Sequence, residues 1–283
     1  MREQLWLALR NSAALRKLYG LRAFALPMRV ASGILLPSSS RRRLRVQAGL
    51  ARGLLVEVDP RWEHAVWDGS YESKNAEAFL RLVKRDAVVF DIGANFGFYA
   101  MLAARAGAKV VAFEPFPDNS RNLSNHVDLN GLGDRIRVVP LAVFSRTGHI
   151  RLEIPTDVSA NRNTKMCADD AVPGIEVACT TLDDFVETST PPGIIKLDVE
   201  GAEADVLRGA DRVFRTFRPE LLCEVHDHAN AAFVEAWLEE RSYEYAWIEE
   251  GSFPKHLLAS PSGHFRADSP RVNSRLTRSC CTT

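Results

Sequence analysis

The feature of this sequence that most constrains its fold is the stretch VVFDIGANFGFYA, residues 88–100. A short apolar run opens it, and Gly93 and Gly97 follow four positions apart, just before a second apolar segment. Such a run followed by spaced glycines is typical of a buried parallel strand that turns tightly into a helix. A loop of this kind leaves room and backbone N–H groups for a phosphate or a nucleoside at the carboxyl end of the strand.

The central part of the chain continues this alternation of strand and helix patterns. Helix start and stop signals agree with this pattern. Pro117 stands where a helix is expected to begin, and Asn130 and Gly131 stand where it is expected to end. Thr181 and Asp184 resemble a helix cap. The pattern predicts an α/β fold with a doubly wound, mostly parallel sheet. The expected strands lie near residues 87–91, 109–113, 136–140, 194–198, 220–225 and 243–248, and the expected helices near 74–84, 95–106, 117–130, 201–214 and 229–240.

Composition narrows the class of protein. The chain has 283 residues, 46% of them hydrophobic and 25% charged, which suits one well-cored soluble domain with an appendage. Its five cysteines show no CxxC spacing, so neither a disulfide framework nor a zinc finger is indicated and a reducing cytoplasm is expected. No apolar run reaches the roughly 18 residues that span a bilayer.

Charge is concentrated at the amino-terminal end. Residues 1–53 carry eleven Arg or Lys residues against the single acid Glu3, a net charge of +10, with leucines at helical spacing. This pattern predicts a basic helical extension that packs on the main domain or on a partner subunit, in a homo-oligomer, or that binds an anionic membrane surface. We expect the cluster Arg41–Arg45 to be a solvated helix start, and its lack of interleaved aromatic residues argues against nucleic-acid binding.

The predicted division of the chain therefore has three parts. The basic extension covers residues 1–53 and the main domain covers residues 54–262. Residues 263–283 are rich in Ser, Arg and Thr with few large apolar residues, which predicts a disordered tail.

The residues around the glycine loop indicate what the loop binds. Glu114 ends the next strand, 23 positions after Asp91, where a carboxylate commonly accepts hydrogen bonds from ribose hydroxyls. The loop has Asn95 where a dinucleotide site has its middle glycine, so a nucleoside without a pyrophosphate fits better. Asp91 suits a cationic amine, and S-adenosylmethionine carries both an amine and a ribose.

Seven blocks of sequence, in order, resemble the FkbM family of S-adenosylmethionine-dependent methyltransferases. The resemblance extends from Gly69 to about Glu249 and leaves out the basic extension and the tail. The blocks are GSYE (69–72), VVFDIGANFGFYA (88–100), AFEPFPDN (112–119), VVPLAV (138–143), TTLDDF (180–185), IIKLDVEGAEADVLRGA (194–210) and PELLCEVH (219–226).

The resemblance implies a Rossmann-like class I methyltransferase fold with an antiparallel strand at the sheet edge, to which His256–Ser260 would belong. It also implies O-methylation of a sugar, lipid-linked glycan or polyketide hydroxyl. Ala142 would lie near the adenine, and Glu72 would approach the cofactor from above, although a solvated residue before a helix is an equal interpretation of Glu72. The residues implied to bind the cofactor are Glu72, Asp91, Gly93, Ala94, Asn95, Gly97, Phe98, Glu114, Pro115 and Ala142.

The chemistry points to residues 196–203. Asp198 would end a strand beside the reacting methyl group, where a carboxylate can orient the acceptor hydroxyl and take its proton. Lys196, Glu200 and His226 complete the predicted catalytic set, while Glu203 is expected to face solvent.

A metal site is the main alternative to metal-free catalysis. In an extended segment Glu224, His226 and His228 share one face, and Asp198 would make a fourth ligand. A single histidine is more often a structural group, so no metal is predicted; His126 and His149 also receive structural interpretations.

Two rival functions and one unassigned segment complete the predictions. A nucleotide-dependent oxidoreductase or epimerase is disfavoured by Asn95, and a non-catalytic cofactor-binding scaffold is disfavoured by the intact block 196–203. The polar span 155–179 lacks periodicity and suits either a lid over a small-molecule or glycan acceptor or a mobile loop.

Overall fold

The computed structural model describes residues 41–59, 63–153, 165 and 173–261. The chain divides into two compact units, Met1–Tyr71 and Glu72–Thr283. The predicted tail and the first 40 residues of the basic extension lie outside the described residues, so the docking role of the extension stays a prediction. Within the described ranges, no helix combines the length and the apolar character needed to cross a membrane.

The first unit contains a hairpin followed by a short helix. Strand β1 (Arg42–Arg45) pairs antiparallel with β2 (Leu55–Val58), and α4 (His64–Asp68) follows. The prediction of a helix start at Arg41–Arg45 is therefore wrong, because the pairing with β2 overrides the local pattern. The unit ends at Tyr71 rather than at residue 53, since a boundary at 53 would separate the two strands of the hairpin.

The second unit is built on a seven-stranded sheet, in the order β11-β12-β10-β9-β3-β4-β5. Its central strands β10, β9, β3, β4 and β5 run parallel to one another, as the alternating pattern predicted. The strands are β3 (Val88–Ile92), β4 (Lys109–Phe113), β5 (Ile136–Val139), β9 (Ile194–Leu197), β10 (Glu220–Val225), β11 (Tyr243–Trp247) and β12 (Lys255–Pro261).

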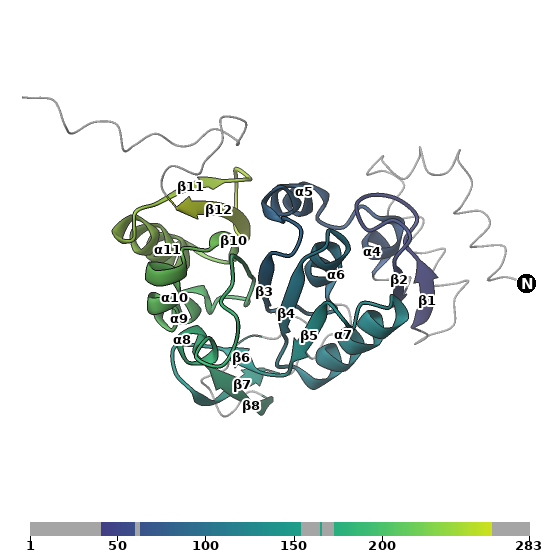
Figure 1. Ribbon diagram of the computed structural model, residues 1–283, viewed down its shortest axis with the longest axis horizontal. Helices are drawn as coiled ribbons and strands as arrows, with labels where there is room; N and C mark the ends of the chain where they lie inside the picture. The colour runs from purple at the N-terminus through teal and green to yellow at the C-terminus, as the bar shows by residue number, and fades with distance from the viewer. Residues whose placement is uncertain (1–40, 60–62, 154–164, 166–172, 262–283) are drawn as a thin grey trace, which may run out of the picture. The chain divides into compact units, whose positions relative to one another are not determined.

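Helices cover both faces of this sheet, which confirms the doubly wound, Rossmann-like arrangement (Figure 1). Helices α6 and α7 pack on one side of the central strands, and α8–α11 lie on the other side (Figure 1). The helices are α5 (Ser73–Leu82), α6 (Phe98–Arg105), α7 (Pro117–Leu129), α8 (Leu182–Phe185), α9 (Glu203–Arg208), α10 (Asp211–Phe217) and α11 (His228–Glu240).

Three local details of the fold follow from particular residues. The expected helix over 201–214 is two helices, α9 and α10, because the chain bends at Gly209, where a side chain would collide with the carbonyl oxygen of Phe144. The Thr181 hydroxyl accepts a hydrogen bond of 2.9 Å from the Asp184 N–H, which confirms the predicted cap. The antiparallel strand β12 lies between β10 and β11, one position inside the edge.

A second, three-stranded sheet lies in the crossover between β5 and β9. It is formed by β6 (Ala142–Val143), β8 (Gly174–Thr180) and β7 (Gly148–Glu153) in that order. The span 155–179 was predicted to lack regular structure, which is wrong for its last part, β8. The buried residues of this strand are Val177, Cys179 and Thr180, so the alternation is short and is broken at its end. The partner strand β7 lies before the span. Residues 154–164 and 166–172, where the predicted lid falls, lie outside the described residues.

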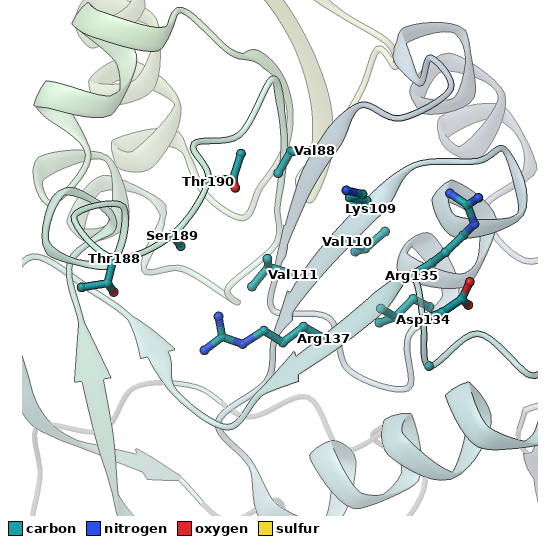
Figure 2. Close-up of a pocket in the computed structure, with 12 residues that line it drawn as sticks. Val88, Lys109, Val110, Val111, Asp134, Arg135, Arg137, Thr188, Ser189 and Thr190 are labelled. Atoms are coloured by element: carbon teal, nitrogen blue, oxygen red, sulfur yellow. The ribbon is translucent and has the colours of Figure 1, made fainter.

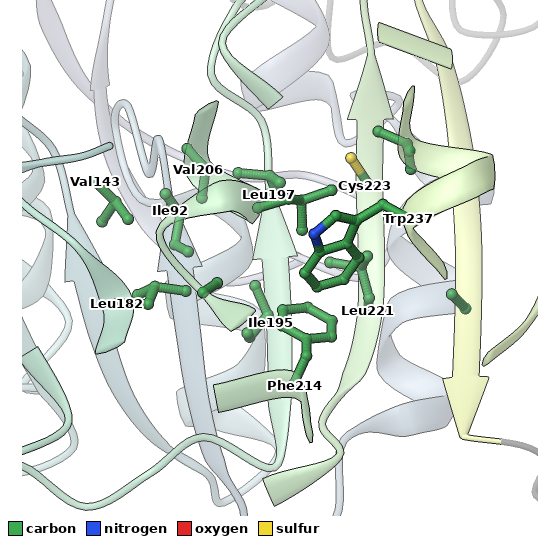
Figure 3. Packing of buried hydrophobic residues seen from close by; sticks show 14 of the residues in the cluster. Ile92, Val143, Leu182, Ile195, Leu197, Val206, Phe214, Leu221, Cys223 and Trp237 are labelled. Atoms are coloured by element: carbon green, nitrogen blue, oxygen red, sulfur yellow. The ribbon is translucent and has the colours of Figure 1, made fainter. Parts of the chain in front are cut away.

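Both faces of the main sheet are apolar over most of their area, but at the carboxyl ends of the central strands one face carries ionisable side chains. Ile195, Leu197, Leu221 and Cys223 point toward α9–α11, where the apolar core is packed (Figure 3). The intervening residues point to the other face, and strand register places Asp91 beside Lys196 and Glu224 beside His256. The carboxyl ends of β3, β9 and β10 therefore bring ionisable side chains together on one face.

The core under α10 gives a stability prediction with an internal control. Phe214 is fully buried, and its ring centroid lies 4.8 Å from that of Trp237, whereas Phe217 of the same helix is 41% exposed. We expect Phe214→Ala to lower the free energy of unfolding by about 3 to 5 kcal/mol, through lost burial and the cavity left behind. Phe217→Ala should change it by less than about 0.5 kcal/mol. Urea unfolding measures both values, and equal losses would contradict this account of the core.

Candidate active site

The turn between β3 and α6 is formed by residues 93–97, as the sequence predicted. Its backbone is left-handed at Gly93, Asn95 and Gly97, with φ of 76°, 49° and 89°. A side chain on Gly93 would collide with the carbonyl oxygen of Asp198, and one on Gly97 with Leu123. The backbone of Asp198 therefore requires glycine at 93, whereas at 97 the left-handed φ favours glycine and the end of the Leu123 side chain could shift.

Glu114 lies immediately after β4, and its carboxylate joins this strand end to the glycine loop. The Asn95 N–H donates to Oε2 at 2.8 Å and the Phe116 N–H donates to Oε1 at 2.9 Å. Burial raises the pKa of Glu114 to about 7, although these two hydrogen bonds oppose the rise. The Asn119 side chain donates a third hydrogen bond to this carboxylate, which leaves one lone pair for a further donor, such as a ribose hydroxyl.

Asp91 is the most unusual carboxylate of the site. It is fully buried on β3, and neither of its oxygens has a hydrogen-bond partner among the described residues. Burial raises its pKa to about 6; the Lys196 ammonium and the Ala100 N–H oppose the rise, although neither makes a hydrogen bond of normal geometry to it. A buried polar group without a partner is costly, so a cationic or donor ligand would stabilise it.

Lys196 and Asp198 form a close ion pair at the end of β9. The distance from Lys196 Nζ to Asp198 Oδ2 is 2.9 Å, and the lysine side chain is 4% exposed. Burial lowers the pKa of Lys196, but the carboxylates of Asp198, Asp91 and Glu72 outweigh it, so the pKa is raised above its ordinary value. The ammonium also lies 4.9 Å from the centroid of the Tyr99 ring. Lys196 is thus a fixed charge that holds one oxygen of Asp198.

His226 is held between acidic residues at the start of α9. Its Nδ1 lies 2.7 Å from Glu203 Oε1, and its Nε2 lies 3.3 Å from Glu200 Oε2 and 3.9 Å from Asp198 Oδ1. Burial lowers the pKa of His226, but the hydrogen bonds with Glu200 and Glu203 raise it further, to about 10. The imidazole is therefore charged at neutral pH and cannot serve as a general base there.

Glu203 was expected to face solvent, and that prediction is wrong. Its side chain is fully buried and holds His226, and its Oε1 also accepts a hydrogen bond of 2.9 Å from the Gly201 N–H. The first residue of a helix can turn its side chain back toward the chain that precedes it, and periodicity alone does not reveal this. The three predicted residues Asp198, Glu200 and His226 do come together in the structure.

Glu72 is not the solvated residue of the alternative interpretation. It precedes α5 with a left-handed φ of 41°, and the Tyr99 hydroxyl donates to its Oε2 at 2.7 Å. His256 of β12 lies beyond it, with Nε2 3.7 Å from Glu72 Oε2 and 3.4 Å from Glu224 Oε2. Tyr99, Glu203 and His256 are site residues that sequence reasoning missed, because helix packing and strand register, not local spacing, bring them here.

The remaining predicted cofactor residues occupy three settings. Ala94 belongs to the glycine loop and its N–H donates to the Phe113 carbonyl oxygen at 2.9 Å. Phe98 begins α6 and is buried, and Pro115 is half-buried beside Glu114. Ala142 is buried in β6, within the apolar cluster of the small sheet. Its place beside an adenine stays a prediction.

His228 does not share a face with Glu224 and His226, so that part of the alternative metal set is wrong. Strand β10 ends at Val225, and Asp227 caps α11 by accepting a hydrogen bond of 2.8 Å from the Asn230 N–H. The His228 ring packs against Phe253, with centroids 4.8 Å apart. His126 is structural as predicted, since it is fully buried with Nδ1 2.9 Å from the Phe96 carbonyl oxygen.

A cavity of about 560 Å³ lies at the other end of the strands (Figure 2). Val88, Lys109 and Ile136, the first residues of β3, β4 and β5, help to line it. Ligands of open α/β sheets bind at the carboxyl ends of the strands, so this cavity is separate from the ionisable cluster. Its other lining residues include Arg135, Arg137 and Thr188–Thr190 (Figure 2).

Comparison with known proteins identifies two relatives. Hexuronic acid methyltransferase AglP of Haloferax volcanii is 28% identical to this chain, over 62% of this chain and 70% of the relative. Methyltransferase sdnD of Sordaria araneosa is 25% identical, over 55% of this chain and 73% of the relative.

Solved structures of methyltransferases also match. The FkbM methyltransferase from Methylobacillus flagellatus KT has a TM-score of 0.45 and 20% identity, over 62% of this chain and 43% of that chain. The C-terminal domain of precorrin-6Y C5,15-methyltransferase from Rhodobacter capsulatus has a TM-score of 0.45 and 13% identity, over 66% and 88%. The present chain thus spans less than half of the M. flagellatus protein.

The family comparison covers the site itself. The model of the methyltransferase FkbM domain matches residues 91–245, which is more than half of the chain. The matched range begins at the buried Asp91 and includes the glycine loop, Glu114, the Lys196–Asp198 pair and His226. This chain therefore belongs to the FkbM family of methyltransferases.

Proposed function

We propose that this protein is an S-adenosylmethionine-dependent O-methyltransferase that acts on a sugar hydroxyl. The observation that carries the proposal is the arrangement at the carboxyl ends of the strands. Asp91 and Glu114 flank the glycine loop, and Asp198 ends the neighbouring strand β9. This arrangement offers a nucleoside site and an acid–base group side by side.

The residues present fit the proposed cofactor. The unpaired, buried carboxylate of Asp91 would gain a cationic partner in the amine of the methionine part. Glu114 would accept a hydrogen bond from a ribose hydroxyl while it keeps its two backbone donors and the Asn119 side chain. When bound, S-adenosylmethionine supplies an electrophilic methyl group on a sulfonium, which is a good leaving group.

Asp198 is the residue that we assign to the acceptor. Lys196 holds its Oδ2, which leaves Oδ1 available to an incoming hydroxyl. During transfer of the methyl group, the Asp198 carboxylate would take the proton of the acceptor hydroxyl. His226, held by Glu200 and Glu203, places a positive charge beside Asp198 and cannot itself take a proton.

The acceptor class follows from the relative and from the charge of the site. AglP is named a hexuronic acid methyltransferase, and a hexuronic acid offers both hydroxyls and a carboxylate to a methyl donor. The described residues of the site contribute more carboxylates than cations, which disfavours a bare carboxylate as the reacting group. Sugar hydroxyls, in contrast, donate readily to carboxylates.

The test is methyl transfer to defined sugars. Purified protein is incubated with methyl-labelled S-adenosylmethionine and glycans that end in glucuronic acid or in a neutral hexose, and the label in the glycan is measured. We expect label that survives mild alkali, as a methyl ether does. Label that mild alkali releases as methanol would show a methyl ester and overturn the hydroxyl assignment, and no S-adenosylmethionine binding in a calorimetric titration would overturn the proposed cofactor.

A further inference from the structure

Three ionisable side chains converge beside the proposed acceptor site from three different elements. Glu72 precedes α5, Glu224 belongs to β10 and His256 belongs to β12, where strand register places it directly opposite Glu224. One ligand atom from each lies within 4.8 Å of the other two. Their side chains are 22%, 15% and 7% exposed, respectively.

The separations in this cluster are long for hydrogen bonds and suit a shared cation. His256 Nε2 lies 3.4 Å from Glu224 Oε2 and 3.7 Å from Glu72 Oε2. Hydrogen bonds between nitrogen and oxygen have lengths of about 2.7 to 3.2 Å. Ligands about 2.0 to 2.2 Å from a tetrahedral metal ion are about 3.4 Å from one another.

Asn75 indicates which nitrogen of His256 carries a proton. Its side chain is buried, its Oδ1 has no hydrogen-bond partner among the described residues, and its Nδ2 lies 2.9 Å from His256 Nδ1. The amide oxygen and nitrogen have nearly the same shape, so a half-turn of the amide places Oδ1 where it accepts a hydrogen bond from the Nδ1–H. This orientation gives the oxygen a partner but leaves the amide NH2 in the position that had none, so the firmer support for a proton on Nδ1 is Glu249 Oε1, 3.2 Å from Nδ1, which accepts from the same N–H.

Burial lowers the pKa of His256, but the carboxylates of Glu72, Glu224 and Glu249 outweigh it, so the pKa is raised and a positive charge is favoured at this ring. A metal ion bound between the three groups would take the place of the Nε2 proton, while Glu249 still accepts from the Nδ1–H. Metal-binding histidines have this second-shell pattern, in which the distal ring N–H donates to a carboxylate or carbonyl oxygen. The Tyr99 hydroxyl, which donates to Glu72 Oε2 at 2.7 Å, orients a second ligand of the set in the same way.

We propose that Glu72, Glu224 and His256 bind one divalent metal ion. One imidazole and two carboxylates suit an ion that accepts both nitrogen and oxygen ligands, such as Zn²⁺ or Mn²⁺. Binding of the ion does not depend on the proposed function. The role of the ion does rest on the proposed function. Next to Asp198, the ion would bind the hydroxyl and carboxylate oxygens of an acidic sugar. Without the ion, the carboxylates of the site would repel the negative charge of that sugar.

Calorimetric titration of the metal-free full chain with Zn²⁺ and with Mn²⁺ tests the proposal. We expect one ion per chain, and at least a 10-fold loss of affinity in His256→Gln and in Glu72→Gln. His149→Gln, at an exposed histidine of β7, is the matched control and should bind the ion as the wild type does. Circular dichroism of each variant checks that it is folded, and Glu249→Gln, which spares all three ligands, should weaken binding even if His256→Gln does not fold.

Two results would overturn the proposal. The first is that the wild type binds neither ion, in which case a proton on His256 is the cation of the cluster. The second is that His226→Gln abolishes binding while His256→Gln and Glu72→Gln do not, which would place the ion on Asp198, Glu224 and His226, a neighbouring set of suitable ligand atoms. A parallel titration with S-adenosylmethionine keeps failure of the metal site distinct from failure of the proposed function.

Discussion

An Asp198→Asn variant is expected to bind S-adenosylmethionine almost normally and to turn over about 100-fold more slowly, or worse. The amide keeps the shape of the side chain but cannot accept the hydroxyl proton, and loss of a general base typically costs a factor of about 100 or more. The measurement is kcat for methyl transfer to a sugar acceptor, together with the dissociation constant of the cofactor.

The control for this substitution is Asp205→Asn. Asp205 lies on α9 and pairs with Arg208 of the same helix at 3.0 Å, so the same chemical change there should leave kcat within about twofold. Full turnover by the Asp198→Asn variant would remove the general base from the mechanism. Alignment of the two substrates would then be the only contribution of the protein to the rate.

A Glu114→Gln variant is expected to bind S-adenosylmethionine about 30- to 150-fold more weakly, which corresponds to about 2 to 3 kcal/mol. The substitution also disturbs two backbone hydrogen bonds, from Asn95 and Phe116, so the affinity loss alone does not identify the ribose contact. A cofactor analogue without ribose hydroxyls separates the two effects. The analogue should bind weakly to the wild type, and Glu114→Gln should weaken it little further; equal losses for both ligands would assign Glu114 to the loop alone.

Cofactor binding by the wild type should also strengthen as pH rises through 7. Burial holds the pKa of Glu114 at about 7 in the free protein, and a ribose hydroxyl that donates to the carboxylate favours its ionised form. Binding therefore lowers this pKa and releases a proton, so the dissociation constant falls between pH 6 and 8. The Glu114→Gln variant, which has no proton to release at this position, should show a flatter profile over the same range.

The sequence by itself determined the fold class and the nucleoside side of the site. A short apolar run, two glycines four apart and an acid at the end of the next strand are local patterns with few structural solutions. The structure has the strand, turn and helix in the predicted places, and the glycines are explained by the left-handed backbone of the turn and, at Gly93, by a collision with the backbone of Asp198. The hairpin at Arg42–Arg45 and the strand β8 were not determined in this way, because each is stabilised by pairing with a segment elsewhere in the chain.

Only the tertiary structure decided the acceptor side of the site. Glu203 is a buried partner of His226 because the first residue of α9 lies in space beside the residue that follows β10. His256 lies beside Glu224 and Glu72 because β12 pairs antiparallel with β10. These residues are separated by many positions, and no periodicity of one segment records which residue of another will lie opposite. Register between strands fixes that pairing, and burial then sets the charge of each group, so the direction in which each pKa moves follows from the fold and not from the motif.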